Sequence, residues 1–353
     1  MIQGKAIVIT GGLLTSNHAK TAHGLIRGSE RFDIVAVIDE KHTGNDAGTL
    51  LDGNPRDIPV YSTVEQFLAT KVPASYAVIG VATKGGVIPE TMKEELKECI
   101  SAGMSIVNGL HEHLTSIPAL NDLAKAKNVS LIDIRKSKPF GEARFWNGDI
   151  VKVKCPKIAV LGTDCALGKR TTTRFITQAL TKAGHKAEMI YTGQTGWMQG
   201  AKYGFIFDAT LNDFISGELE GAVLKCYENE RPDIIVIEGQ SSLRNPSGPC
   251  GSEFIISARL DGVILQHHPK RVHYKDMEYY PDLVASPAEE IQLIKMLGTE
   301  TIAIALNTSG TDEDEIKEYQ QKLESDLGIP VVRPLEEGME RLTGVCENLI
   351  NRQ

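Results

Sequence analysis

One stretch near the middle of the chain, residues 158–173, constrains the fold more than any other. It reads IAVLGTDCALGKRTTT: an apolar run ends at Gly162, and Gly168 and Lys169 precede a helical pattern that begins at Arg174. Strand, glycine-bounded loop and helix together form a cradle for an anion, because the loop N–H groups and the helix N-terminus point at the bound group. The stretch therefore predicts a phosphate-binding loop within a parallel α/β sheet.

The match to the phosphate-binding consensus G-x-x-x-x-G-K-[ST] has two departures. Five residues, instead of four, separate Gly162 from Gly168, and Arg170 occupies the position where a Ser or Thr hydroxyl normally binds Mg²⁺. We therefore expect a bound phosphate group and no metal, and we do not expect hydrolysis of Mg-ATP. The alternative is an ordinary glycine-rich turn between a strand and a helix.

Length and charge limit the class of protein. The chain has 353 residues, 41% of them hydrophobic and 24% charged, which suits a globular protein of two domains. Its net charge of −8 offers no broad basic surface, so we expect no nucleic-acid partner. A small phosphorylated ligand in a local basic pocket remains compatible with this charge.

Cysteine spacing and hydropathy bear on location. The six cysteines are scattered without a C-x-x-C pair, so neither a disulfide framework nor a structural zinc site is indicated. No apolar run reaches the roughly 18 residues of a membrane span, and a strand pattern begins at Lys5 without room for a signal peptide. We expect a cytoplasmic protein without a membrane partner, and a homo-oligomer, with a dimer favoured.

Residues 1–150 are predicted to form one domain. Short apolar runs alternate with helical patterns, which indicates a parallel sheet covered by helices. The runs lie at 5–10, 34–38, 76–81, 105–107 and 129–134. Glycines after the first run and Asp39 after the second are typical of a Rossmann-like half. The fingerprint G-x-G-x-x-G is absent, and Asp39 lies later than the expected ~20 residues after the glycines, so a nicotinamide cofactor is not expected.

Other features of this half allow two interpretations. The glycine pairs at 11–12 and 85–86 follow strands, where either a ligand crevice or a tight turn fits. His111 and His113 share one face if they lie on a strand and could bind a metal, but no third ligand is near, so a hydrogen-bonding or surface role is favoured. Residues 135–150 have no clear period and indicate a linker.

Residues 151–353 are predicted to form a second domain around the phosphate-binding loop. Further apolar runs lie at 187–191, 233–237, 262–266, 301–306 and 329–332. Polar loops follow three of them: TGQTG at 192–196, EGQSS at 238–242 and HHPKR at 267–271. The carboxyl ends of parallel strands meet at one edge, so we expect these loops beside the phosphate loop. Glu238 has the place of a Walker-B acid, which holds a metal or water or accepts a proton; a turn cap is the alternative.

Two motifs of the second half resemble those of a known enzyme. GTDCALGKRTT and IEGQSS are similar to the loop and the acidic strand of dethiobiotin synthetase, which implies its P-loop fold for this half. Arg170 departs from that pattern because it stands in place of the metal-binding Thr.

A second resemblance extends over nearly the whole chain. The stretches GLIRGSERFDIVAVID, NGLHEHL, GTDCALGKRTT, TGQTG and IEGQSSL are similar to a two-domain family long regarded as having unknown function, which joins a Rossmann-like N-terminal domain to a P-loop C-terminal domain. The resemblance implies an α/β fold of two domains, a Rossmann-like parallel sheet followed by a three-layer parallel sheet like that of P-loop NTPases. Ser241 departs from the family's Gly, and the tract RNPSGPCG departs from a more apolar one.

A characterised branch of this family is D-glutamate N-acetyltransferase. The resemblance implies acetyl-CoA as co-substrate and D-glutamate as acceptor, within D-amino-acid catabolism. A phosphate loop without the Mg²⁺ hydroxyl suits the phosphates of CoA, with charge from Lys169 and Arg170. The residues expected to bind acetyl-CoA are Gly162, Thr163, Cys165, Gly168, Lys169, Arg170, Thr171 and Thr172.

Acetyl transfer to an amine needs a base, because an ammonium group has no lone pair. Glu238 is the first candidate and Asp164 the second. We expect TGQTG to contact the oxyanion or the substrate and the cations to bind the substrate's carboxylates. The residues expected to bind the amino acid are Thr192, Gly193, Gln194, Thr195, Gln240, Ser242, Arg244, His267, Lys270 and Arg271.

Three alternatives remain open from the sequence. An ATP-dependent kinase or amine-carboxylating ligase of the dethiobiotin synthetase kind would require Mg²⁺ and release ADP. A non-catalytic nucleotide or metabolite sensor would bind a ligand without turnover. Within the acetyltransferase hypothesis, Cys165 offers a covalent acetyl-cysteine route, although a cysteine in such a loop more often only fits the space.

Overall fold

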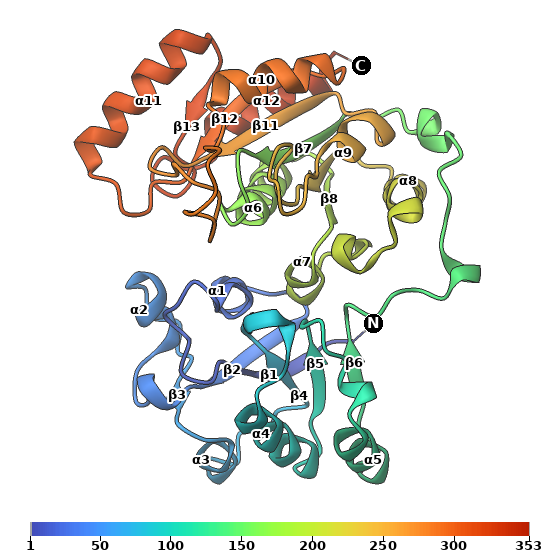
Figure 1. Ribbon diagram of the computed structural model, residues 1–353, viewed down its shortest axis with the longest axis vertical. Coiled ribbons are helices and arrows are strands. Elements are labelled where there is room, and N and C mark those ends of the chain that lie inside the picture. Colours follow the sequence, from blue (N-terminus) through green and yellow to red (C-terminus); the bar gives the residue numbers. More distant parts are fainter. Residues whose placement is uncertain (1, 353) are drawn as a thin grey trace. The chain divides into compact units, whose positions relative to one another are not determined.

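The computed structural model describes residues 2–352 and divides the chain into two compact units. The first unit holds residues 2–137 and 194–201, and the second unit holds 138–193 and 202–352. Each unit contains one sheet in which every strand pair is parallel (Figure 1). The predicted fold, two α/β sheets of Rossmann-like and P-loop-like type, is confirmed.

The sheet of the first unit has the strand order β3-β2-β1-β4-β5-β6, the classic order of Rossmann-like sheets. Its strands are β1 Gly4–Ile9, β2 Phe32–Ile38, β3 Val60–Tyr61, β4 Tyr76–Ile79, β5 Ser105–Asn108 and β6 Leu131–Asp133. Its helices are α1 Lys20–Arg27, α2 Ala47–Asp52, α3 Val64–Ala69, α4 Glu90–Ser101, α5 Pro118–Lys127 and α7 Gln194–Gln199. Residues 6–9 of β1 are fully buried, because helices cover both faces of a parallel sheet.

The sheet of the second unit has the strand order β13-β12-β11-β7-β10-β8-β9. Its strands are β7 Lys157–Gly162, β8 Ala187–Tyr191, β9 Tyr203–Gly204, β10 Ile234–Glu238, β11 Gly262–His267, β12 Thr301–Leu306 and β13 Val331–Val332. Its helices are α6 Lys169–Lys182, α8 Asn212–Glu230, α9 Ser252–Ser257, α10 Pro287–Met296, α11 Glu313–Leu327 and α12 Glu340–Ile350. The central strand β7 lies between β10 and β11, so the loops after these three strands share one edge.

Short 3₁₀ helices complete the described secondary structure. They are Glu40–His42, Lys84–Gly86, Leu114–Ser116, Phe140–Glu142, Asp149–Lys152 and Phe207–Ala209. In residues 2–352, no helix is both long and apolar enough to cross a bilayer.

The segment predicted as a linker, residues 135–150, differs from that expectation. From Lys138 onward it packs on α8 of the second unit. The carboxylate of Glu218 accepts the backbone N–H of Arg144 (3.0 Å), and that of Glu220 accepts those of Asn147 and Ile150 (both 3.0 Å). These bonds satisfy backbone groups of an irregular segment, so it is a fixed part of the second unit and the division falls before Lys138, not after Ile150.

The TGQTG stretch also differs from the single loop expected, because α7 begins at Gln194 and returns to the first unit. Met198 is fully buried in the first unit's core. The amide of Gln199 donates to the carbonyls of Gly24 (2.8 Å) and Gly28 (3.1 Å). Arg31 lies over the ring of Trp197, 4.1 Å from its centroid. Tertiary contacts thus form a helix in a Gly- and Thr-containing stretch of low helix propensity.

Candidate functional site

The phosphate-loop geometry begins at Gly162, the last residue of β7, and ends at Gly168, the N-cap of α6. Gly168 has a φ of 109° in the left-handed region, where glycine avoids strain, and no side chain caps the helix. A Cβ at Gly162 would lie 3.2 Å from the carbonyl oxygen of Gln266. The first turn of α6 therefore presents backbone N–H groups without a capping side chain, as an anion site requires.

Lys169, the first residue of α6, is buried, with 6% of its surface exposed, and its side chain reaches back to the loop. Its Nζ donates to the carbonyl oxygens of Asp164 and Ser241, at 2.7 Å each. Burial lowers the pKa of the ammonium group to about 8. An anion beside Nζ would favour the charged form, so the position suits phosphate binding.

Glu238 ends β10, beside the phosphate loop, and is 5% exposed. Its carboxylate accepts the N–H of Thr192 at 3.1 Å and a further backbone bond from Gly193. Burial raises the pKa of this carboxyl, while the charges of Arg170 and Lys169 and the two N–H groups oppose the rise. A carboxylate that is held in place and has a raised pKa suits proton transfer.

The loops after β8 and β10 hold each other in place. The hydroxyl of Thr192 donates to the carbonyl of Glu238 (2.7 Å) and accepts from the side-chain amide of Gln240 (2.9 Å). A Cβ at Gly193 would lie 3.1 Å from that amide nitrogen. Ser242 is 2% exposed, and its hydroxyl has no hydrogen-bond partner among the described residues. An unsatisfied buried hydroxyl beside the phosphate loop is consistent with a polar ligand there.

Gln194 and Thr195, the other residues of TGQTG expected to bind substrate, lie in α7 and so in the first unit. The hydroxyl of Thr195 is 2.9 Å from that of Thr21. Thr192 and Gly193, which belong to the second unit, hydrogen-bond to Glu238. The expected single substrate loop is thus divided between the units.

Asp164, the second candidate base, is fully buried and bonded on both oxygens. Its carboxylate accepts the amide of Asn245 (2.9 Å), the guanidinium of Arg271 (2.6 Å) and the backbone N–H of Lys275 (2.9 Å). Donors of the protein itself thus occupy both carboxylate oxygens, so the arrangement favours a structural role over proton transfer. It also engages Arg271, one of the cations expected to bind the substrate.

His267 does not fit the cationic role expected for it. Its Nδ1 lies 3.0 Å from the hydroxyl of Thr163, and its Nε2 lies 3.0 Å from the hydroxyl of Tyr319 on α11. Burial lowers the pKa of the imidazole to about 4, so the ring is neutral near physiological pH. It orders the phosphate loop through Thr163 instead. Tyr319 lies far away in sequence, within a charged helix, and the pattern there gave no sign of this contact.

The remaining predicted cations are paired with carboxylates. Arg244 donates to Glu290 (2.9 Å), and the ammonium of Lys270 lies 2.8 Å from Glu315. Within the predicted CoA-binding set, the hydroxyl of Thr172 donates to the side chain of Gln266 (2.6 Å). Cys165, Arg170 and Thr171 are half-buried on the loop and the first turn of α6. Substrate and CoA contacts by all these residues stay predictions.

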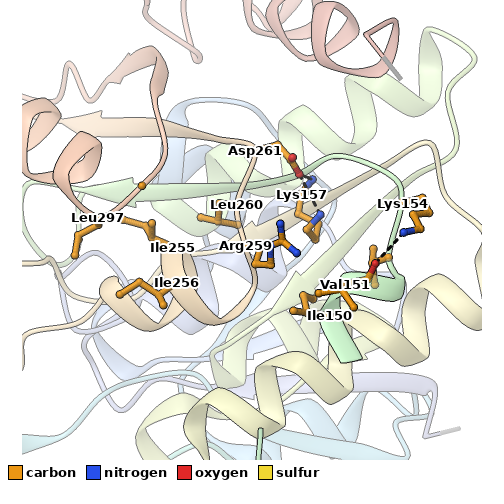
Figure 2. Close-up of a pocket in the computed structure, with 12 residues that line it drawn as sticks. Ile150, Val151, Lys154, Lys157, Ile255, Ile256, Arg259, Leu260, Asp261 and Leu297 are labelled. Atoms are coloured by element: carbon orange, nitrogen blue, oxygen red, sulfur yellow. Dashed lines mark hydrogen bonds and ion pairs between the residues drawn. The ribbon is translucent and has the colours of Figure 1, made fainter. Parts of the chain in front are cut away.

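The described residues contain no metal-binding cluster, and a cavity of the second unit lies away from the phosphate loop. Across residues 2–352, no group of three or more His, Cys, Asp or Glu is placed to hold a metal ion. The second unit has a cavity of about 500 Å³. The ammonium of Lys157 lies 3.1 Å from the carboxylate of Asp261 at its wall, and both side chains are labelled in Figure 2. Lys157 begins β7, so this cavity lies at the edge opposite Gly162. Ligands of such sheets bind at the carboxyl ends of strands, so it is not the predicted site.

The fold and the loop after β7 define a class: a P-loop protein with a Rossmann-like domain in the same chain. The chain belongs to the DUF1611 family. Residues 144–343 match its C-terminal P-loop domain, and residues 40–137 match its N-terminal Rossmann-like domain, each described as a domain of unknown function. This confirms the family indicated by the sequence motifs.

Similar proteins include named enzymes and a solved structure. A D-glutamate N-acetyltransferase from Pseudoalteromonas sp is 28% identical over 279 residues, which covers 78% of this chain and 82% of that protein. Another enzyme with this name, from Tritonibacter scottomollicae, is 29% identical over 277 residues, which covers 76% of this chain and 80% of that protein. The crystal structure of a DUF1611 family protein from Anabaena variabilis matches with a TM-score of 0.89 and 30% sequence identity. The match covers 98% of this chain and 99% of that protein.

Proposed function

We propose that the protein is an N-acetyltransferase that moves the acetyl group of acetyl-CoA to the amino group of D-glutamate. The observation that carries this proposal is the pairing of an anion cradle at Gly168 and Lys169 with the buried carboxylate of Glu238. The name of the two similar enzymes, D-glutamate N-acetyltransferase, supports D-glutamate as the acceptor and an acetyl group as the group transferred.

The residues of the loop fit the phosphates of CoA. The uncapped first turn of α6 supplies N–H donors, and Lys169 supplies a buried positive charge. The hydroxyl of Ser242 is a further donor without a partner in the described structure. Arg170 adds charge where an ATP-hydrolysing loop would place a hydroxyl on Mg²⁺. This set suits a phosphate that is bound but not cleaved.

Glu238 is the proposed general base. Its carboxylate takes a proton from the substrate ammonium group, and the neutral nitrogen then attacks the carbonyl carbon of the thioester. A carbon–nitrogen bond forms and the carbon–sulfur bond breaks. The nitrogen then gives up its second proton, the departing CoA thiolate takes up one proton, and Glu238 returns the proton that it accepted to the solvent. The raised pKa of Glu238 supports this role because it makes the carboxylate a stronger proton acceptor than an ordinary glutamate.

Thiol release tests the proposal. The protein is mixed with acetyl-CoA and one of several acceptors: D-glutamate, L-glutamate, D-aspartate or none. We expect free thiol and a mono-acetylated product with D-glutamate, at a rate well above that with the other acceptors. Thiol release that is the same with and without D-glutamate would overturn the proposal. ADP release from Mg-ATP with D-glutamate would instead support the ATP-dependent alternative.

A further inference from the structure

The first unit contains a cavity of about 400 Å³ whose lining comes from this unit alone. It lies beyond the carboxyl ends of β4 and β5, next to the first turn of α1. The strand order reverses between β1 and β4, and open α/β sheets bind ligands at such a reversal. The volume is at the lower end of the range for small-molecule sites.

A dinucleotide does not fit this unit, because the acid that would bind its ribose is used internally. Asp39, at the end of β2, accepts the hydroxyl of Thr10 (2.7 Å) and the N–H groups of Leu14 (2.9 Å) and Lys41 (3.1 Å). The Nδ1 of His42 lies 2.7 Å from Oδ1 of Asp39, the oxygen that also accepts the N–H of Lys41. Ribose hydroxyls would have to displace these bonds, so the cavity calls for a smaller ligand.

The polar side chains that line the cavity carry positive charge or none. They are those of Thr21, Thr83, His111, Arg135 and Gln194, and no Asp or Glu is among the lining residues. The Nε of Arg135 donates to the carbonyl of Gly109 at 2.6 Å, which fixes the plane of the guanidinium group at the cavity wall. A fixed guanidinium is the preferred partner of a planar carboxylate.

Two glycines allow the cavity walls to approach each other. A Cβ at Gly86 would lie 2.7 Å from the ring of His111, and one at Gly109 would lie 2.9 Å from the side chain of Gln194. Larger residues at either position would displace these polar groups. Ile79, Val81 and Leu110 form an apolar part of the wall. The cavity thus combines one cation, an amide, hydroxyl groups and an apolar surface.

We propose that this cavity binds a small carboxylic acid of about amino-acid size. Arg135 pairs with a carboxylate, Gln194 and the hydroxyl of Thr21 bond to the ligand's polar groups, and the apolar wall contacts its carbon chain. The proposal concerns binding to the first unit and is independent of acetyl transfer, so either proposal can fail without the other.

Hydrogen exchange of the whole protein tests this site without an activity readout. D-glutamate, L-glutamate, 2-oxoglutarate, inorganic phosphate and NAD are each added at millimolar concentration. We expect at least one carboxylate to slow exchange at residues 79–86 and 109–111. Protection of these residues by phosphate or NAD alone, or by none of the compounds, would overturn the proposal.

Two variants and one control assign the effect to the cavity. Arg135→Gln and Gln194→Leu should each weaken binding of the protecting carboxylate about tenfold or more, since each removes a hydrogen-bond donor to a charged group. Lys125→Gln makes the same change of charge on an exposed helix face and should leave binding unchanged. Thermal melting checks that the variants fold. Unchanged binding in both cavity variants would contradict the assignment.

Discussion

Glu238 and Asp164 are buried carboxylates of the second unit that differ in their donors. Asp164 accepts hydrogen bonds from a guanidinium, an amide and a backbone N–H, which together occupy both of its oxygens. Glu238 accepts backbone N–H groups, and burial raises its pKa despite nearby positive charge. The difference in surroundings, more than the residue type, therefore separates the proposed base from a carboxylate with a structural role.

Substitution of Glu238 tests the base. In Glu238→Gln we expect kcat for D-glutamate acetylation to fall about 10²–10⁴-fold, because the amide cannot accept the proton. The KM for acetyl-CoA should change little. Steady-state thiol release measures both, and the exposed Glu228→Gln serves as control. In the wild type, the rate should fall as pH decreases through the raised pKa of Glu238. Retention of near wild-type kcat would exclude this base.

Lys169 gives a prediction about protons at the same site. Burial lowers its pKa to about 8, and a bound phosphate should raise it. At a pH between the pKa of Lys169 in the free protein and its higher pKa in the complex, binding of acetyl-CoA must be accompanied by proton uptake at Lys169. The affinity for acetyl-CoA should therefore fall as pH rises above about 8. Calorimetry at about pH 8.5, in two buffers of different ionisation enthalpy, measures this uptake.

A matched pair of variants assigns the uptake to this side chain. Lys169→Met should abolish it, and the exposed Lys182→Met on the same helix should not. An uptake that persists in Lys169→Met would show that another group titrates.

At the scale of elements, α8 is the support of residues 138–150. Gly217 lets this segment approach the helix: a Cβ there would lie 1.9 Å from the carbonyl oxygen of Arg144. Glu218 and Glu220 then bind its backbone N–H groups. The atoms nearest to this Cβ position belong to the backbone, and a backbone cannot rotate out of the way as a flexible side chain can.

Gly217→Ala should therefore destabilise the protein by about 1–3 kcal/mol or more, through overpacking. Gly344→Ala in α12 is the matched control, since nothing lies within 4 Å of its Cβ position. There, the better helix propensity of alanine should stabilise by about 0.5–1 kcal/mol. Urea denaturation measures both changes. Equal changes of the same sign would contradict this account of Gly217.

Sequence periodicity was sufficient to predict most strands and helices, but not the contacts that hold residues 138–150 and the phosphate loop in place. Buried strands such as 233–237 and the glycines and lysine of the phosphate loop are local signals. The prediction that residues 135–150 form a linker was wrong from Lys138 onward. The backbone of this segment hydrogen-bonds to Glu218 and Glu220, which lie far along the chain. Two further sets of contacts also join residues far apart in sequence. Asp164 pairs with Arg271, and His267 contacts both Thr163 and Tyr319.

For the molecule as a whole, the first unit depends on a helix encoded within the second half of the sequence. Met198 of α7 is fully buried in the first unit. Met198→Ala should cost about 2–5 kcal/mol and should speed hydrogen exchange in β1 and β4, although residue 198 lies beyond β8 in sequence. Met296→Ala, at an 85% exposed position, is the control. Faster exchange confined to the second unit would contradict the assignment of α7.

The position of α7 in the sequence has a consequence for synthesis. A chain made from its N-terminus normally folds each domain as it emerges. Here the core residues that contact Met198, and the carbonyls that accept from Gln199, cannot make these contacts until residue 201 has been synthesised. By then the residues of β7, α6 and β8 of the second unit have already been made. The first unit therefore cannot complete its core before part of the second unit has been synthesised.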